Sequence, residues 1–247
     1  MIVSAALCPA PPLLIHDLTG AQQVAADLRN ACLASIAELT AATPDVIAVV
    51  GAGTRTRIWN SAAGLDLARY APWPDLANGQ RQADRERAAE ESAAGPPGLP
   101  SALGVGAWLL GQSGSTAERV LQAVAADEPA GACAVIGADL ASARERVALL
   151  VMADGSARRG LKAPGYLDER STWFDAEVVN AVREGRLEAL LAIDALLARE
   201  LMAEGRPAWQ VLAGALEGRR VSSEIRYCDD PFGVAYLVAS LRVHEET

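Results

Sequence analysis

Several short, uninterrupted apolar runs predict buried strands. Ile2–Leu7 precedes a proline-rich turn, and 44–53 (PDVIAVVGAG) lies between a proline and a glycine turn. An apolar run without alternation is typical of a strand that is buried on both faces. The stretch 146–156 (RVALLVMADGS) has the same form, and we interpret 131–139 (GACAVIGAD) as a further strand. The chain closes with two more strand candidates, 221–230 and 233–243, joined by a turn around Asp229–Gly233.

Other segments place their apolar residues at helical spacing. Ala21–Thr40 carries an apolar residue every three or four positions, with Thr19 or Gly20 as its cap. The same spacing predicts four more helices, over Thr116–Ala126, Trp173–Glu184, Leu187–Ala203 and Ala208–Leu216.

The order of these elements predicts an α/β fold, with a central, mostly parallel or mixed sheet and helices on both faces. No internal repeat is evident, and 247 residues suffice for one large domain, so we expect a single domain over 1–247. The segment from Thr54 to Ser101 is rich in Gly, Pro and charge. Its most polar part, around 75–101, is predicted to be a mobile surface excursion.

Composition and charge restrict the partners. Twenty-two basic and 31 acidic residues give a net charge of −9, which argues against nucleic acid, because phosphate binding needs clustered Lys and Arg. No apolar run approaches the roughly 18 to 20 residues of a membrane-spanning helix. The first residues lack the basic start and long apolar stretch of a signal peptide. We therefore expect a cytoplasmic protein with no nucleic-acid or membrane partner.

Cysteine and histidine are sparse. The four cysteines form no CxxC pair, so buried free thiols are expected rather than zinc or redox motifs. They are Cys8, Cys32, Cys133 and Cys228. Because His16 and His244 are the only histidines, a metal site built from two or three histidines is not expected.

Ligands of α/β sheets usually bind beyond the carboxyl ends of the strands. Three strand-end turns are therefore candidates: 8–12 (CPAPP), 51–57 (GAGTRTR) and 152–159 (MADGSARR). The helix junction 203–209 (AEGRPAW) is a fourth candidate. Each has an ordinary alternative, since GAGTRTR lacks GxGxxG or Walker spacing and Asp-Gly-Ser is a common turn. No GxSxG motif occurs and neither histidine is an obvious base, so serine hydrolase chemistry is not predicted.

Taken in order, the four stretches resemble the motif positions of the class III extradiol ring-cleaving dioxygenases. The similarity is to their catalytic (B-type) subunit, its bacterial B-subunit-like members and the related Memo family. There, a first strand ends in a His-x-Pro motif whose histidine binds iron, and a second histidine follows the next strand. An Asp-x-Ser-His-like motif supplies an acid/base histidine, and a late helix supplies a glutamate, or a cysteine in Memo. Segments 163–182 and 227–241 are also similar to B-subunit-like members, whereas 55–110 matches little.

The resemblance implies an Fe(II) site that lacks its nitrogen donors. Ala10 stands in place of the first histidine, Thr54 or a neighbour in place of the second, and Ala157 in place of the acid/base. Glu204 matches the carboxylate ligand, and His16, past two prolines, is expected to point elsewhere. Fe(II) in such enzymes needs two imidazoles and a carboxylate, and proton transfer commonly contributes about 10²–10⁴-fold to the rate. We therefore expect no metal, no cofactor and no iron-dependent ring cleavage.

Loss of the imidazoles predicts a vestigial pocket. Its residues are Cys8, Ala10, Thr54, Asp154, Ser156, Ala157 and Glu204, and the candidate anion contacts are Arg55, Arg57, Arg158 and Lys162. A buried Glu204 without iron needs a partner, so we expect it to pair with Arg206 or with an arginine of the 55–57 turn. A pseudoenzyme with a binding, scaffold or regulatory role is favoured. The alternative is an oxidoreductase or other small-molecule enzyme that uses the remodelled pocket. A small-molecule ligand, a homodimer and another protein partner all stay open.

Overall fold

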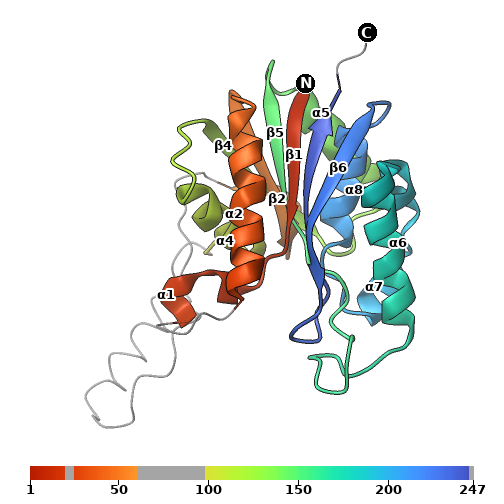
Figure 1. Ribbon diagram of the computed structural model, residues 1–247. Helices are drawn as coiled ribbons and strands as arrows, with labels where there is room; N and C mark the ends of the chain where they lie inside the picture. Colours follow the sequence, from red (N-terminus) through yellow and green to blue (C-terminus); the bar gives the residue numbers. More distant parts are fainter. Residues whose placement is uncertain (20–24, 60–97, 245–247) are drawn as a thin grey trace, which may run out of the picture.

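The computed structural model of the protein describes residues 1–19, 25–59 and 98–244, which form one seven-stranded mixed sheet between two layers of helices (Figure 1). The strand order is β3-β4-β2-β5-β1-β7-β6. The strands are β1 (Ile2–Cys8), β2 (Val46–Gly53), β3 (Arg57–Trp59), β4 (Glu118–Ala125), β5 (Val147–Met152), β6 (Val221–Asp229) and β7 (Tyr236–Val243). This arrangement confirms the predicted α/β fold.

The centre of the sheet is parallel and its margins are antiparallel. Strand β5 lies between β1 and β2 and is parallel to both, and β4 is parallel to β2. Strands β7, β6 and β3 are antiparallel to their neighbours. All six residues of β5 are buried, because helices cover it on both faces. The apolar runs that became β1, β2 and β5 therefore lie in the interior of the sheet, as predicted.

The helices divide the core into two halves. They are α1 (His16–Thr19), α2 (Ala26–Ala41), α4 (Ser101–Gly111), α5 (Ala130–Ser142), α6 (Arg170–Glu184), α7 (Ala195–Glu200) and α8 (Arg206–Ala215), with short 3-10 helices η1 (Pro12–Leu14) and η3 (Leu187–Ala192). Helices α2 and α4 cover one face of the sheet, and α5, α6 and α8 cover the other (Figure 1). Along β1 the side chains alternate between the halves: Leu7 faces α8, and Cys8 faces α2. No helix in the described segments is long and apolar enough to cross a bilayer.

Several predicted elements were wrong. Thr116–Ala126, predicted as a helix, contains strand β4, because its backbone pairs with β2 on one side and β3 on the other. The predicted strand 131–139 lies within helix α5, which packs on α8. The predicted helix Leu187–Ala203 is divided into η3 and α7. At the start of α7, the carboxylate of Asp194 accepts a hydrogen bond from the Leu197 amide.

Other elements were not predicted or lie outside the described residues. Strand β3 and helix α4 had no counterpart in the sequence interpretation. Thr19 ends α1, while residues 20–24, including the alternative cap, are outside the described part of the chain. Most of the predicted excursion around 75–101 is also outside it; where the description resumes, Leu99 is buried and α4 begins two residues later.

Candidate functional site

The turns after β1 and β5 meet the start of α8 at the carboxyl edge of the sheet. The Ala153 amide donates to the Cys8 carbonyl at 2.8 Å, and the Ala10 amide donates to Oδ1 of Asp154 at 2.9 Å. The Gly205 amide donates to the Asp154 carbonyl at 2.9 Å, and a Cβ at position 205 would lie only 2.5 Å from that oxygen. Three of the four stretches that the sequence singled out therefore form one cluster, in which glycine permits the close approach of α8.

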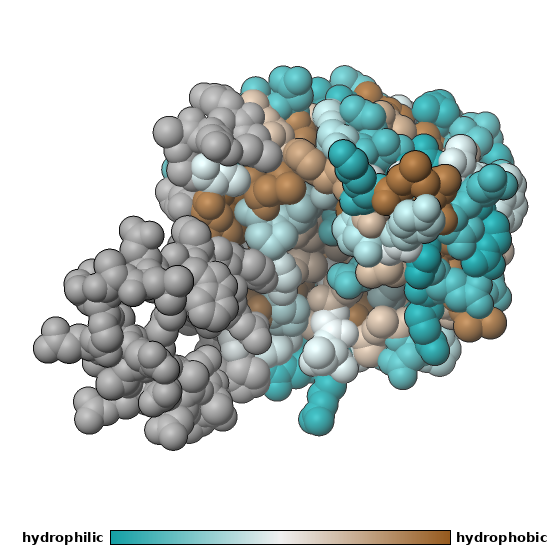
Figure 2. Space-filling model, turned by 90° about the horizontal axis from the view of Figure 1, so that it is seen from below, coloured by the Kyte–Doolittle hydropathy of each residue, from teal (hydrophilic) through white to brown (hydrophobic). Residues whose placement is uncertain are grey.

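Figure 2 views this edge from below, onto the carboxyl ends of the parallel strands, and shows hydrophilic and hydrophobic side chains interspersed. The remaining stretch, 51–57, reaches the same edge, because β2 pairs in parallel with β5 up to Gly51 and Met152. Thr54 and Arg55 follow β2 and are exposed. The described hydrogen bonds thus connect the stretches 8–12, 152–159 and 203–209. Thr54, in the stretch 51–57, lies beyond the end of β2.

The expectation that Glu204 is buried and paired was wrong. Glu204 is exposed, and the described residues form no ion pair with it. Its expected partner, Arg206, is buried and directed elsewhere: Nη1 donates to Oε1 of Gln210 at 2.6 Å, and Nη2 donates to the carbonyls of Ala126 and Glu128 at 2.7 and 2.8 Å. Because α8 begins at Arg206, that side chain turns into the protein while Glu204 stays outside the helix.

Burial raises the pKa of the Asp154 carboxyl to about 7. The hydrogen bond from the Ala10 amide lowers this pKa, and the nearby negative charge of Glu204 raises it. On the same face of the sheet, the hydrogen bond with Cys8, followed by burial, raises the pKa of the Cys32 thiol. The turn after β1 is thus lined by groups that favour their protonated, neutral forms.

Replacing Asp154 by Asn is expected to flatten the pH dependence of stability. The native carboxyl binds its proton more tightly than the unfolded chain does. Its stabilising contribution is therefore complete below about pH 4 and is lost as the pH rises through about 7. The full shift would correspond to about 4 kcal/mol, which we halve because Asp154 is only partly buried. In urea unfolding, Asp154→Asn should match the wild type at pH 4 and exceed it by up to about 2 kcal/mol at pH 8.

The exposed Asp139 supplies the matched control, since Asp139→Asn removes a carboxylate from the outer face of α5. It should reproduce the wild-type pH profile. Equal stabilities of Asp154→Asn and wild type at both pH values would show that the carboxyl at position 154 is hydrated like a surface group.

Ser156 faces away from Asp154 and is held by helix α6. It is fully buried, its amide donates to Oδ1 of Asp175 at 2.9 Å and its hydroxyl donates to Oδ2 at 2.5 Å. Burial raises the pKa of Asp175, whereas the two bonds from Ser156 and the charge of Arg159 lower it. Ala157, also buried, donates its amide to the Leu201 carbonyl at 3.0 Å. The Asp-x-Ser-Ala stretch is therefore fixed on both sides by main-chain and carboxylate bonds.

The structure separates the candidate anion contacts. Arg57 packs on the ring of Trp59, 3.6 Å from its centroid, on the edge strand β3. Strand β3 is three positions from β5 in the sheet, about 14 Å at the usual strand spacing. Arg158 follows β5 and donates to the Gly165 carbonyl at 2.5 Å, while Lys162 is exposed. Arg57 and Arg158 thus serve different local contacts.

The residues at the motif positions do not fit the Fe(II) site that the resemblance implies. Ala10 and Ala157 present methyl groups, and His16 is exposed with its ring 5.4 Å from that of Trp108. Within the described residues, no group of three or more His, Cys, Asp or Glu side chains could hold a metal ion. The described side chains at these positions therefore do not supply the two imidazoles and one carboxylate that a ferrous site of this kind needs.

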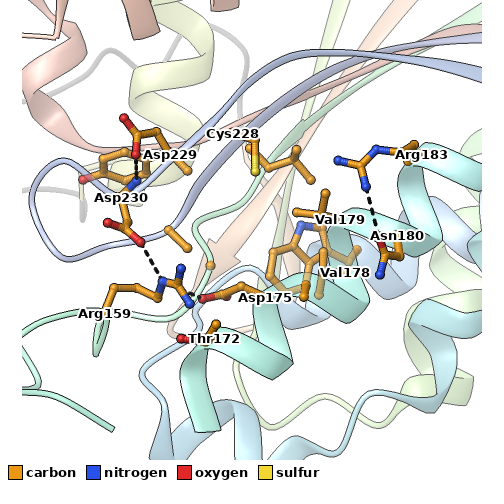
Figure 3. A pocket seen from close by; sticks show the side chains of 16 residues that line it. Arg159, Thr172, Asp175, Val178, Val179, Asn180, Arg183, Cys228, Asp229 and Asp230 are labelled. Atoms are coloured by element: carbon orange, nitrogen blue, oxygen red, sulfur yellow. Dashed lines mark hydrogen bonds and ion pairs between the residues drawn. The ribbon is translucent and has the colours of Figure 1, made fainter. Parts of the chain in front are cut away.

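A pocket of about 370 Å³ lies elsewhere, between α6 and the β6–β7 hairpin (Figure 3). Neither this pocket nor a smaller one beside η3 is lined by the predicted vestigial-pocket residues. Sequence reasoning missed Asp175, which meets Arg159 and Asp230 here, and it predicted no contact between these three residues. One signal was available: Asp175 falls on the inward stripe of the predicted helix, between Phe174 and Val178, where a carboxylate is unusual. Cys228, expected to be buried, also lines the pocket and is exposed, whereas the other three cysteines are free and buried as predicted.

Comparison with known proteins bears on the fold. No family model matches the chain, and no curated protein matches it. Among solved structures it is similar to the crystal structure of the uncharacterized protein JW3007 from Escherichia coli K12, with 15% sequence identity and a TM-score of 0.53. The match covers 97% of this chain and 99% of that chain. At this identity the likeness shows a shared fold alone.

Proposed function

We propose that the protein is a member of the class III extradiol dioxygenase superfamily that has lost iron-dependent ring cleavage and serves a binding, scaffold or regulatory role. The observation that carries this proposal is the hydrogen bond from the Ala10 amide to the Asp154 carboxyl. Ala10 occupies the position where the resemblance places an iron-binding imidazole. Its methyl side chain is buried, and its main-chain amide donates a hydrogen bond to the Asp154 carboxyl.

The chemistry of the neighbouring groups supports the same proposal. Asp154 has a pKa of about 7, so a substantial fraction is protonated near neutrality. A protonated carboxyl is a poor metal ligand, because a metal must displace the proton. Glu204 alone is a single exposed carboxylate, and the acid/base position holds Ala157. The side chains that would bind iron and the side chain that would transfer a proton in ring cleavage are thus both missing.

One observation favours a second candidate, an enzyme with altered chemistry. A carboxyl that titrates near pH 7 is suited to general acid–base catalysis, and Asp154 lies at the carboxyl edge of the sheet, where active sites of α/β proteins gather. If Asp154 acts in this way, substitution by Asn abolishes turnover without a loss of stability. Its hydrogen bond from Ala10 accounts for its position without catalysis, so the first candidate is favoured.

The test is purification with Fe(II) under anaerobic conditions, followed by metal analysis and an oxygen-electrode assay with catechol and protocatechuate. We expect substoichiometric iron and no oxygen uptake above the buffer rate, with an authentic extradiol dioxygenase run in parallel. Stoichiometric iron together with oxygen uptake by the wild type would overturn the proposal.

A matched pair of variants checks that the missing donors are the cause. Ala10→His with Thr54→His restores two imidazoles, whereas Ala10→Asn with Thr54→Asn adds side chains without imidazole nitrogen. We expect the histidine pair to retain more iron after dialysis than the asparagine pair. Equal retention would show that something other than these two positions limits metal binding.

A further inference from the structure

The pocket between α6 and the β6–β7 hairpin reaches Gly155, next to Asp154, but neither Asp154 nor Ala10 lines it. Its lining includes Trp209 of α8 and Leu237 of β7, which belong to the core half covered by α6 and α8. Ala10 belongs to the opposite half. A volume of about 370 Å³ falls within the range of sites for small metabolites.

One end of the pocket is acidic. The guanidinium of Arg159 lies between two carboxylates (Figure 3): its Nε is 2.7 Å from Oδ2 of Asp230 and 3.8 Å from Oδ2 of Asp175. One cation and two anions leave a net negative charge. Because Asp175 is buried and Arg159 is itself mostly buried, this charge is only partly screened by water.

The other end carries a cation without a carboxylate partner. Arg183 donates from Nη1 to Oδ1 of Asn180 at 3.0 Å (Figure 3), and no carboxylate of the described residues forms an ion pair with it. Val178 and Val179 lie between the two ends along α6 (Figure 3). Asp175 and Arg183 are eight residues apart on one helix, which separates them by about 12 Å along its axis.

Cys228 lies on the opposite wall, from β6. Burial raises the pKa of its thiol, while the charges of Arg183 and Arg159 lower it. The neutral thiol, together with the two valines and Leu237, makes the middle of the pocket apolar. A raised pKa also disfavours the thiolate, so the pocket is suited to reversible binding rather than to nucleophilic chemistry.

We infer that this pocket binds a short zwitterionic peptide of two or three residues, with its amino terminus at the acidic end, beside Asp230, and its carboxylate at Arg183 and Asn180. An extended chain of two or three residues spans about 7–10 Å, which fits the axial separation after allowance for hydrogen-bond contacts. Apolar side chains of the peptide would lie over Val179, Cys228 and Leu237. The lining holds three carboxylates, Asp175, Asp229 and Asp230, against two arginines. This balance disfavours phosphates and nucleotides, which need clustered cations.

The experiment is isothermal titration calorimetry with L-leucyl-L-leucine, its N-acetyl derivative and its C-terminal amide. The free dipeptide should bind, and each blocked form should bind about tenfold more weakly, because it loses a charge-assisted contact at one end. Arg183→Gln should weaken the free dipeptide about tenfold and leave the amide unchanged. Asp230→Asn should remove the preference for the free amine over the acetylated form.

The control is Arg199→Gln, which removes an exposed arginine of α7 outside the pocket and should leave all three affinities unchanged. Circular dichroism melting verifies that each variant is folded. Absence of binding by the free dipeptide at millimolar concentration would overturn the inference, as would equal effects of Arg183→Gln and Arg199→Gln. Iron content does not enter either outcome, so this inference stands or falls separately from the proposed loss of ring cleavage.

Discussion

Replacing Arg206 by Ala is expected to lower the free energy of unfolding by about 3–5 kcal/mol. Arg206 is 2% exposed, and its guanidinium donates to one side-chain oxygen and two carbonyls. Alanine would leave the Gln210 amide oxygen and the carbonyls of Ala126 and Glu128 without these donors. Each buried acceptor without a donor costs about 1–3 kcal/mol. Urea unfolding monitored by circular dichroism measures the loss.

Two further variants make this expectation specific. Arg206→Lys keeps the charge, but its ammonium lacks the planar fork that reaches three acceptors, so it should recover only part of the stability. Arg199→Ala, at an exposed position, should stay within about 0.5 kcal/mol of the wild type. A loss below about 1 kcal/mol for Arg206→Ala would mean that water replaces the guanidinium at these acceptors.

The consequence reaches the candidate site. Arg206 holds the loop between β4 and α5 against the first turn of α8, immediately after Gly205 contacts Asp154. The charge of Arg206 is thus stabilised by acceptors inside the protein, whereas the sequence interpretation had offered either Arg206 or an arginine of the 55–57 turn as the partner of Glu204. A buried arginine bonded to carbonyls cannot be foreseen from its neighbours in sequence, because the carbonyls belong to residues about 80 positions away.

The parts of the fold that sequence predicted are those in which local pattern and final environment agree. Strands β1, β2 and β5 are apolar without interruption because they lie in the middle of the sheet. Strand β4 was mistaken for a helix because Val120, Leu121 and Val124 have helical spacing. Pairing with β2 and β3 decided its conformation, and pairing partners lie far away in the chain.

The candidate site shows the same division. Convergence of the turns after β1 and β5 followed from the rule that parallel strands end at one edge of the sheet, and the bond from Ala10 to Asp154 is its result. The exposure of Glu204 depended on where α8 begins, which helical spacing fixes only to within a few residues. The pocket beside α6 needed the position of the β6–β7 hairpin over that helix, and no motif encodes this placement.

Replacing Gly137 of α5 by Ala is expected to lower the free energy of unfolding by about 3 kcal/mol, at the upper end of overpacking losses. A Cβ at this position would lie 2.2 Å from the Val211 carbonyl oxygen and 2.5 Å from the Ala215 amide nitrogen, and these backbone atoms cannot rotate away. Gly131, in the first turn of the same helix, has nothing within 4 Å of its Cβ position, so Gly131→Ala should stay within about 0.5 kcal/mol of the wild type. Thermal and urea unfolding compare the stabilities of the two variants.

Hydrogen exchange gives a second measurement. Since α8 starts at the turn that contacts Asp154, a shift of α8 away from α5 should also move Gly205. Hydrogen exchange of the Gly205 amide should therefore accelerate in Gly137→Ala alone. Equal stability of the two alanine variants would show that α5 and α8 pack farther apart.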